Sequence, residues 1–352
     1  MNVTRLLHWY HEHKRDLPWR RTKDPYKIWV SEIIMQQTRV DQGMPYYSRF
    51  ISRYPSISDL ALADEQSILK LWQGLGYYSR GRNMHAAAKQ IQSDFQGRFP
   101  DTYAEIRRLK GIGDYTAAAI ASIAFELPHP VVDGNVLRFF SRFYGIETAI
   151  DAVETKKEIY RLACAVIPVE NPGDFNQAIM EFGAMVCTPK NPGCDHCTFH
   201  TTCVARINGL TSRIPVKGKK TSQRHRYFHY LVKRSHDGMN ISMKKRSESD
   251  IWKGLYDFPL IETDNPATFR ELIGLSEWKE LTKNHPGKGI RRSAAFRHLL
   301  THQVIHARFY EWCTDRSLFA DETWFHMEEL KNLPLPRLID HYLQAGAPPL
   351  KT

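Results

Sequence analysis

The sequence predicts a mainly α-helical domain over residues 1–212 and a smaller α+β domain over residues 226–352. Three observations support this division. Apolar residues recur at helical spacing through the first region. Residues 213–225 then combine basic side chains with Pro, Gly, Ser and Thr, which is typical of a linker. Beyond them, β-rich runs with period-two alternation take over.

The helical region has its clearest start signal at Asp24-Pro25, where Asp caps a helix and Pro fits its first turn. Residues 26–39 are apolar around most of the circumference, which indicates a buried helix. Gly or Pro separates the later segments. Further helical patterns extend over residues 57–71, 79–94, 102–109, 114–126, 134–144, 154–166 and 172–186.

The C-terminal region predicts a sheet with a few helices. Residues 227–233 are rich in β-formers, and residues 305–310 alternate between apolar and more polar side chains. Helical stretches near 266–274 and 336–345 make this domain α+β. The basic linker at 213–225 serves either as a solvated tether or as a contact for phosphates, and the sequence leaves both open.

The composition excludes a disordered chain. Hydrophobic residues make up 42% and charged residues 25%, as in ordinary globular proteins. The most apolar run, residues 117–125, is far shorter than the roughly 20 residues that span a bilayer, and the N-terminus has no signal-peptide region. We therefore expect a soluble, intracellular, cytoplasmic protein. The formal net charge of +11 favours a polyanionic partner such as nucleic acid, with generic basicity as the alternative.

Residues 109–120 form the first specific motif, Leu-Lys-Gly-Ile-Gly-Asp-Tyr-Thr-Ala-Ala-Ala-Ile. A helix ends, Gly111 and Gly113 make a tight turn, and a helix of small residues follows. The glycines allow a phosphate to approach backbone N–H groups, and the positive end of the next helix points the same way. An ordinary helix–Gly–helix turn is the alternative, but the flanking residues favour a site for the DNA backbone.

Two carboxylates are candidates for acid–base chemistry. Glu32 lies among apolar residues, and an apolar pocket would raise its pKa and make it a general acid near neutral pH. A structural ion pair is the alternative. Asp133 either caps the helix at 134–144 or, kept ionised by helix N–H groups, stabilises a cation.

Four of the six cysteines crowd into 17 residues, with the spacing C-x6-C-x2-C-x5-C. A reducing compartment disfavours disulfides, so the group predicts metal ligation. A zinc ion and a [4Fe–4S] cluster both take four cysteines, and the residues alone leave this choice open. The isolated Cys164 and Cys313 are expected to be buried thiols. The predicted ligands are Cys187, Cys194, Cys197 and Cys203.

The hairpin, the stretch Val132-Asp133-Gly134-Asn135-Val136 and the cysteine spacing together resemble the endonuclease III superfamily of DNA glycosylases. The resemblance narrows to the MutY-type adenine DNA glycosylases. It is strong over residues 1–212 and weaker over the rest. It implies a helix-hairpin-helix glycosylase fold with an iron–sulfur loop at 187–203, whose four cysteines hold a [4Fe–4S] cluster. The stretches that narrow it are Leu17-Pro18-Trp19-Arg20, residues 29–40 (Trp-Val-Ser-Glu through Gln-Gln-Thr-Arg-Val), residues 72–80 (Trp-Gln-Gly-Leu-Gly-Tyr-Tyr-Ser-Arg) and Phe175-Asn176-Gln177-Ala178.

This resemblance implies that a monomer binds double-stranded DNA and removes adenine mispaired with 8-oxoguanine or guanine, after the base has left the stack. Glu32 would protonate adenine at N7, and Asp133 would stabilise the oxocarbenium-like sugar or bond to it transiently. Tyr115 and Asn135 would orient groups around Asp133. Lyase members of the superfamily carry lysine where Tyr115 stands, so we expect no efficient strand cleavage.

The resemblance also implies residues that hold the substrate. Gln37 and Tyr77 would fill or wedge the vacated stack, and core packing is the alternative for Tyr77. Arg20 and Gln177 would lie near the adenine edge, and surface solvation is the alternative for both.

The C-terminal domain resembles the lesion-recognition domain of the same family, which is similar to Nudix hydrolases. Residues 252–259 (Trp-Lys-Gly-Leu-Tyr-Asp-Phe-Pro) and 296–302 (Phe-Arg-His-Leu-Leu-Thr-His) carry the match. Phe269-Arg270-Glu271-Leu272 lacks the paired glutamates of an active Nudix enzyme, so no nucleotide hydrolysis is expected. Thr301, beside His302, keeps a hydroxyl that could bond 8-oxoguanine, whereas Leu300 stands where the family usually has an aromatic residue.

Two other functions fit part of the sequence. The same fold could serve a thymine-glycol or mismatch-thymine glycosylase, although Tyr115 and the C-terminal domain argue against it. A DNA-binding protein without catalysis, held together by zinc or iron–sulfur, would make Glu32 and Asp133 merely structural. The resemblance favours the adenine glycosylase, associated with the nucleoid in the cytoplasm.

Overall fold

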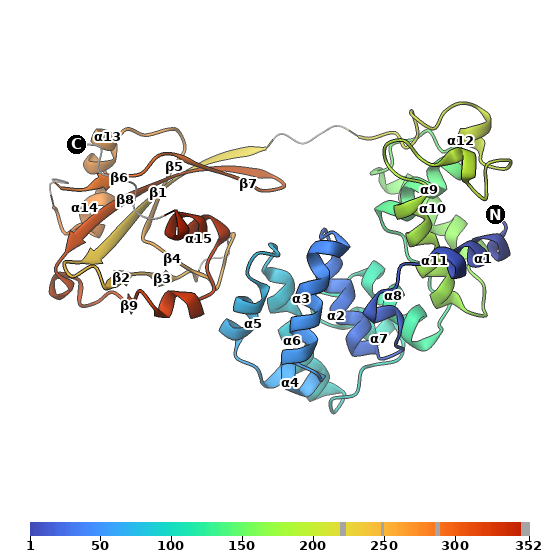
Figure 1. Ribbon diagram of the computed structural model, residues 1–352, viewed down its shortest axis with the longest axis horizontal. Helices are drawn as coiled ribbons and strands as arrows, with labels where there is room; N and C mark the ends of the chain where they lie inside the picture. Colours follow the sequence, from blue (N-terminus) through green and yellow to red (C-terminus); the bar gives the residue numbers. More distant parts are fainter. Residues whose placement is uncertain (219–222, 248–249, 286–288, 346–352) are drawn as a thin grey trace. The chain divides into compact units, whose positions relative to one another are not determined.

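The computed structural model describes residues 1–218, 223–247, 250–285 and 289–345 (Figure 1). The chain forms two compact units, of which the first comprises Met1–Ala63 and Asn83–Lys219. The second comprises Asp64–Arg82 and the chain from Lys220 onward. The first unit is helical and the second is built on a β-sheet, so the predicted fold class is confirmed.

Capping residues explain where several helices of the first unit begin. The Asp24 side chain accepts a hydrogen bond from the Tyr26 N–H at the start of α2 (Pro25–Met35), as the sequence predicts. Thr102 caps α7 (Tyr103–Arg108) in the same way. The other helices that lie wholly or partly in this unit are α1 (Val3–His13), α3 (Val40–Arg53), α4 (Ile57–Leu62), α6 (Ser79–Asp94), α8 (Asp114–Phe125), α9 (Gly134–Tyr144), α10 (Val153–Val166), α11 (Pro172–Met185) and α12 (Val204–Ile207), with 3-10 turns at Pro18–Arg20 and Cys194–His196.

Close packing of α11 against α8 and α9 builds the frame of the site. A Cβ atom on Gly173 would lie 2.6 Å from the Ser122 carbonyl oxygen, and one on Gly183 would lie 2.8 Å from the Asn135 Cβ. Side chains at these two positions would force the helices apart. Small residues therefore bring the three helices together, and the residues between them face a common interior.

The helical boundaries differ from the prediction at three places. Helix α2 ends at Met35 and not at 39, because Gln37 adopts a left-handed conformation with φ 55°. The predicted helix at 57–71 is two helices, α4 and α5 (Glu65–Trp72), which break at Ala63 before the Asp64 cap. Helix α3 was not predicted, since Gly43 and Pro45 interrupt its pattern.

Residues 64–82 belong to the second unit, although the sequence analysis assigned all of 1–212 to the helical domain. The Gln66 side chain donates a hydrogen bond to the Gly254 carbonyl at 3.2 Å. The Lys70 ammonium donates to the Leu333 carbonyl at 2.9 Å. These hydrogen bonds join the segment to the part of the chain that follows the linker.

Two long parallel strands, β1 (Arg224–Ser235) and β8 (Gln303–Thr314), form the centre of the second unit (Figure 1). They pair from Arg224↔Gln303 to Ser235↔Thr314. The neighbours of β1 are β5 (Leu260–Thr263) and β2 (Asn240–Ser242), and β9 (Trp324–His326) pairs with β2. The remaining strands are β7 (Phe296–Leu299) and β6 (Arg291–Arg292), both paired with β8, and a separate two-stranded sheet of β3 (Lys244–Lys245) and β4 (Tyr256–Asp257).

Helices cover both faces of this sheet. Leu231 and Tyr310 pack with α13 (Phe269–Gly274) and α14 (Ser276–Leu281). On the opposite face, Phe309 stacks on Tyr342 of α15 (Arg337–Gln344), with ring centroids 3.9 Å apart. Residues 305, 307 and 309 are buried as the alternation predicts, and Tyr310 is buried as well because α14 covers it. The remaining 3-10 turns are Arg316–Phe319 and Glu329–Asn332.

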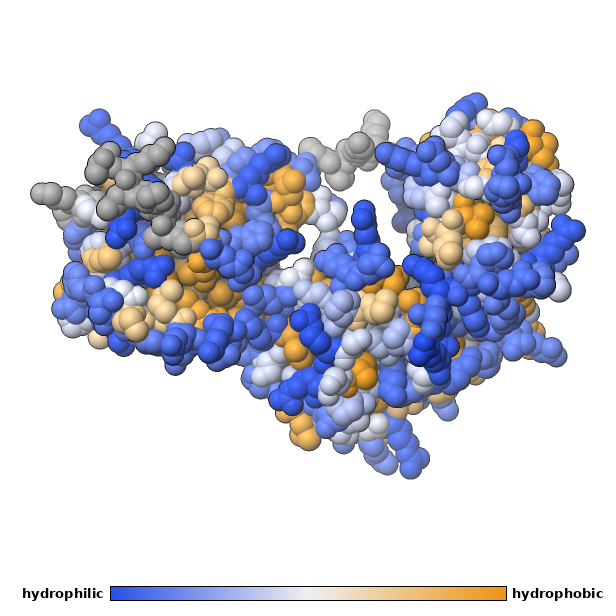
Figure 2. All heavy atoms as spheres, viewed as in Figure 1, coloured by the Kyte–Doolittle hydropathy of each residue, from blue (hydrophilic) through white to orange (hydrophobic). Residues whose placement is uncertain are grey.

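Hydrophilic residues cover most of the surface seen in Figure 2. Among the described residues, no helix combines the length and apolar character needed to cross a membrane. Cys164 and Cys313 are exposed, so the expectation that they are buried was wrong.

Part of the predicted linker at 213–225 lies outside the described residues. Its first part packs on the helical unit, since Ile214 is buried and its carbonyl accepts a hydrogen bond from Arg142 at 2.8 Å.

Candidate active site

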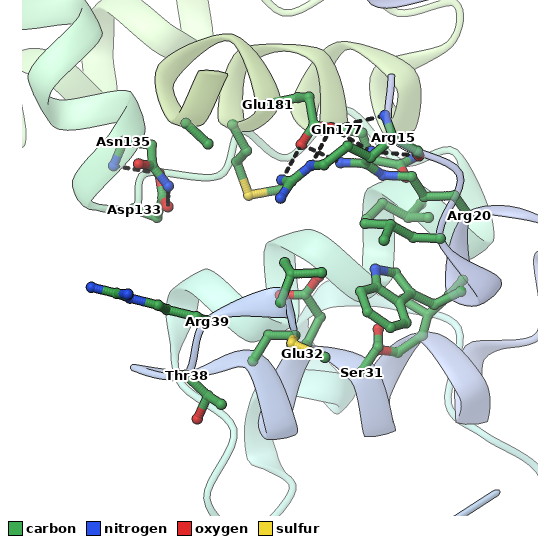
Figure 3. A pocket seen from close by; sticks show the side chains of 18 of the residues that line it. Arg15, Arg20, Ser31, Glu32, Thr38, Arg39, Asp133, Asn135, Gln177 and Glu181 are labelled. Atoms are coloured by element: carbon green, nitrogen blue, oxygen red, sulfur yellow. Dashed lines mark hydrogen bonds and ion pairs between the residues drawn. The ribbon is translucent and has the colours of Figure 1, made fainter. Parts of the chain in front are cut away.

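A cavity of about 520 Å³ opens within the first unit (Figure 3). It is lined by α2, α11 and the segments 15–20 and 38–41, with smaller contributions from α8 and the start of α9. Six of the residues that the sequence analysis singled out for catalysis or substrate binding line it together. Figure 3 shows Glu32 pointing into the cavity from α2, with Asp133 and Asn135 at another wall. The six residues are Arg20, Glu32, Tyr115, Asp133, Asn135 and Gln177.

Glu32 carries the most informative electrostatics of the cavity. Burial raises its pKa to about 7, and the nearby Asp133 charge adds to this rise. The Tyr115 hydroxyl opposes it by donating a hydrogen bond to the Glu32 carboxylate at 2.8 Å. At neutral pH a large fraction of Glu32 is therefore protonated and can release a proton to a group in the cavity.

Asp133 is the N-cap of α9 and is held by three donors. Its Oδ1 accepts hydrogen bonds from the backbone N–H groups of Asn135 and Val136, at 2.9 and 2.8 Å. Its Oδ2 accepts one from the Asn135 side-chain amide at 2.7 Å. Burial raises the pKa of Asp133, while these hydrogen bonds and the Arg138 charge lower it. The donors orient the carboxylate and favour its ionised form.

An ion-pair group that sequence analysis missed lies beside Gln177 in the wall of the cavity. Arg15 and Arg20 each bind the Glu181 carboxylate with two nitrogens, and the four distances are 2.6–2.8 Å. Glu181 is only 1% exposed, and these partners lower its pKa to about 2 although burial alone would raise it. A lone Glu in an apolar helix is a signal, but only the fold shows that two arginines from the N-terminal segment reach it.

We expect Glu181→Gln to destabilise the protein by about 3–5 kcal/mol, because two guanidinium groups would lose their buried carboxylate. The folded-state pKa of about 2 lies below the ordinary 4.5, so this stability is present above pH 4.5 and is lost as the pH falls toward 2. Urea unfolding at pH 7 and pH 3 tests both statements. Asp16→Asn is the matched control, because Asp16 forms an exposed pair with Arg21. An equally small effect of both changes would contradict the prediction.

The predicted DNA-backbone turn lies at the mouth of a neighbouring cavity of about 560 Å³, which is lined by Gly113, Gln37, Tyr115 and Asp133 among others. Gly111 has φ 77°, and a Cβ there would lie 2.5 Å from the Asn83 Cβ, so this position requires glycine. Gly113 precedes α8, whose first turn has no side-chain cap. Gln37 is exposed at this mouth in a strained left-handed conformation, which is typical of functional positions.

Tyr77, Thr301 and His302 belong to the second unit. Tyr77 is 44% exposed and has φ 48°. Like Gln37, it is expected to enter the base stack and has a strained backbone conformation. Its hydroxyl is hydrogen-bonded to the Thr301 hydroxyl. Thr301 and His302 are exposed in the turn between β7 and β8. Core packing of Tyr77 is thus excluded.

The four clustered cysteines line one small cavity beside Phe139, Arg142 and Phe199. The Arg142 guanidinium lies 3.4 Å from the Cys187 Sγ, and the Phe199 N–H donates to the Cys197 Sγ at 3.4 Å. These donors lower the pKa of the two thiols, whereas burial raises the pKa of both by more. Among the residues that the structure describes, no three His, Cys, Asp or Glu side chains are placed to hold a single metal ion.

Residues 30–164 match the family described as HhH-GPD superfamily base excision DNA repair proteins, and residues 213–345 match the NUDIX domain. The adenine DNA glycosylase of Buchnera aphidicola subsp. Schizaphis graminum is 33% identical over 347 residues, which covers 96% of each chain. The adenine DNA glycosylase of Homo sapiens is 42% identical over 210 residues, 57% of this chain and 38% of that protein.

Solved structures of glycosylases resemble the helical part. A thermostable thymine-DNA glycosylase superposes with a TM-score of 0.54 at 29% identity, covering 58% of this chain and 95% of that one. A non-covalent endonuclease III–DNA complex gives a TM-score of 0.51 at 19% identity, covering 59% and 94% of the two chains. The latter likeness shows the fold alone.

Proposed function

This chain belongs to the adenine DNA glycosylases, base-excision repair enzymes of the HhH-GPD superfamily, and we propose that it removes adenine opposite 8-oxoguanine by means of Glu32 and Asp133. Membership of that family establishes that it is a glycosylase that acts on adenine in double-stranded DNA. The lesion preference, the catalytic residues and the monomeric state are the proposal. The observation that carries it is the single cavity in which Glu32, with a pKa of about 7, faces Asp133.

The first chemical step needs a proton. Adenine is a poor leaving group, and protonation at N7 lets it depart as a neutral base. Glu32 supplies this proton, because its raised pKa keeps a large fraction of it protonated near pH 7. The Tyr115 hydroxyl holds the carboxyl in place. Arg20 and Gln177 line the same cavity and contact the edge of the flipped adenine.

The second step stabilises positive charge on the sugar. As the glycosidic bond breaks, the deoxyribose becomes oxocarbenium-like, and an ionised carboxylate beside C1′ stabilises it or bonds to it transiently. Asp133 fits this role, since Asn135 and the first turn of α9 hold its carboxylate in one orientation. Water then completes the hydrolysis, with Glu32 acting as the base.

Recognition of the mispair combines both units. Gly111 and Gly113 bind the DNA backbone through N–H groups, and Gln37 fills the space that the flipped adenine leaves. Tyr77 wedges the stack, while Thr301 and His302 contact 8-oxoguanine. The hydrogen bond between the Tyr77 and Thr301 hydroxyls supports a shared role for these two side chains.

Strand cleavage is not expected from this site. A glycosylase–lyase needs an amine that forms a Schiff base with the sugar, and Tyr115 occupies the corresponding position in the hairpin helix. The phenol of Tyr115 is also occupied as the donor to Glu32. We therefore expect an intact strand with an abasic site as the product.

The four cysteines are proposed to hold a [4Fe–4S] cluster, which would stabilise the loop and take no part in the chemistry. All four cysteines line one cavity, so one group can be held by all of them. The match to the HhH-GPD superfamily favours the cluster over a zinc ion. Purified protein should be brown and hold about four irons per chain, and Cys197→Ser should lose them. Zinc in place of iron would contradict this assignment.

The function is tested by single-turnover assays with the full chain and a duplex that holds one adenine opposite 8-oxoguanine. We expect strand breaks only after hot alkali, faster excision opposite 8-oxoguanine than opposite guanine, and no excision opposite thymine. Breaks without alkali would disprove the monofunctional assignment. Release of thymine or thymine glycol from parallel duplexes, with adenine retained, would favour the rival pyrimidine glycosylase.

A further inference from the structure

A third cavity meets the proposed active site at Asp133. It is an open groove of about 860 Å³ between the start of α9 and the outer side of α10. Asp133 lines this groove, the adenine cavity and the cavity at the hairpin. Gly134 is shared by the groove and the hairpin cavity. No role has so far been given to the groove or to α10.

Cations outnumber carboxylates in the groove. Lys156, Lys157 and Arg161, all from α10, line it together with Asp133 and Glu154. Within the described part of the chain, neither Lys156 nor Arg161 lies within 4.0 Å of a carboxylate. Lys157 pairs with Glu154 at 3.1 Å, but both side chains are more than 60% exposed, so this pair is weak. The three cations are therefore available to an anion.

The groove also exposes apolar surface. Tyr160 is 45% exposed and Val153 is 64% exposed, and both line the groove together with the cations. Large exposed apolar side chains beside cations suit a ligand with alternating apolar and anionic groups. A sugar–phosphate backbone has this character, because each deoxyribose offers apolar carbon and hydrogen surface between two charged phosphates.

The connection at Asp133 indicates which backbone lies there. If Asp133 contacts C1′ of the flipped nucleotide, the base occupies the adenine cavity and one phosphate must lie on each side of that sugar. The hairpin cavity, with Gly113, receives the phosphate on one side. The groove also reaches Asp133 and can receive the phosphate on the other side. From the flipped sugar, the strand that carries adenine can therefore run along the hairpin cavity in one direction and along the groove in the other.

We infer that the α10 groove binds the phosphates on one side of the flipped adenosine, with Lys156, Lys157 and Arg161 as their partners. This inference rests on the proposed roles of Asp133 and the adenine cavity. It assigns α10 to the DNA interface and makes Tyr160 and Val153 a surface for the neighbouring sugars. A protein partner for the groove would instead leave DNA binding independent of these residues.

The test measures binding of the full chain to a duplex with a tetrahydrofuran abasic-site analogue opposite 8-oxoguanine, which holds no base to remove. Each lost phosphate contact should lower the slope of log Kd against log salt by about 0.9, and should raise Kd about eightfold in 0.1 M salt. The double variant Lys156→Ala with Arg161→Ala should therefore raise Kd about 60-fold. Lys27→Ala is the control, since Lys27 is partly exposed, pairs with Asp24 and lines none of the three cavities.

A second measurement locates the phosphate. Neutral methylphosphonates replace single phosphates on either side of the abasic site, one at a time. At the phosphate that Lys156 or Arg161 contacts, the wild-type protein should lose about eightfold in affinity, and the matching variant should lose nothing more. Equal losses in wild type and variant at every position would overturn the inference, as would a variant that binds like Lys27→Ala.

The two proposals fail separately. Lys27→Ala should excise adenine at the wild-type rate, and at limiting enzyme the α10 variants should excise more slowly in proportion to their weaker binding. If the wild-type chain excises no adenine, the proposed function fails whatever the binding data show. If it excises adenine and the α10 variants bind with unchanged salt dependence, only the groove assignment fails.

Discussion

Replacing Glu32 by Gln is expected to slow single-turnover adenine excision by about 10²- to 10⁴-fold, the usual loss when a general acid is removed. Gln keeps the shape and can still accept the hydrogen bond from Tyr115, but it has no proton to deliver to N7. Binding of the abasic duplex should change little, because Gln fills the same space as Glu in the cavity wall. Excision at the wild-type rate by this variant would contradict the role of Glu32 as the general acid.

The pH dependence gives an independent check on Glu32. In the wild-type protein the excision rate should fall tenfold per pH unit above about pH 7, as the acid is lost. Below neutral pH the rate should also fall, as Asp133 becomes protonated. Burial raises the pKa of Asp133, so this fall should begin at a higher pH than it would for a free Asp. The residual excision rate of Glu32→Gln should show no fall above pH 7.

At alkaline pH, Glu32→Gln should lower activity but raise the stability of the fold. The pKa of Glu32 is about 7 in the folded protein and 4.5 ordinarily, so the unfolded chain releases this proton first as the pH rises. Wild-type stability should therefore fall between pH 4.5 and 7, by up to about 3 kcal/mol from this group. Glu32→Gln should be the more stable protein at pH 8 and equal to wild type at pH 4, by urea unfolding. A destabilised variant at pH 8 would indicate a structural carboxylate.

The sequence predicted the fold class and the central residues of the cavity because both depend on local signals. Capping at Asp24 and the glycine turn at Gly111 mark helix ends within a few residues of chain. Glu32 stands out because a charged residue in an apolar helix is rare. The alternation at 305–310 marked a strand for the same local reason.

The parts that were missed depend on contacts between distant segments. Arg15 and Arg20 meet Glu181, more than 160 residues away, and no periodicity connects them. Helix α3 forms although it contains Pro45, since its apolar side packs on α2 and tertiary burial outweighs weak local propensity. The burial of Tyr310 required knowing that α14 covers its face of the sheet. Such couplings need the three-dimensional structure.

Asp133→Asn separates the two roles that the sequence left open for this residue. Asn caps helices about as well as Asp, so a residue that serves only as the N-cap of α9 would tolerate the change. The cost to folding should be only about 1 kcal/mol, from two amide groups facing each other where the Asn135 side chain now donates to a carboxylate. Excision should fall at least about 10²- to 10³-fold, because no charge would remain to stabilise the sugar cation.

The pH profile of this variant distinguishes an electrostatic role from a structural one. The Asp133 charge helps to raise the pKa of Glu32, so Asp133→Asn should lower that pKa and move the upper limb of the residual activity to lower pH. The lower limb should disappear, since no carboxylate remains to titrate. A misplaced helix would reduce the rate without moving either limb. If the variant keeps both the wild-type rate and the wild-type profile, Asp133 is only a cap, and another group must stabilise the cation.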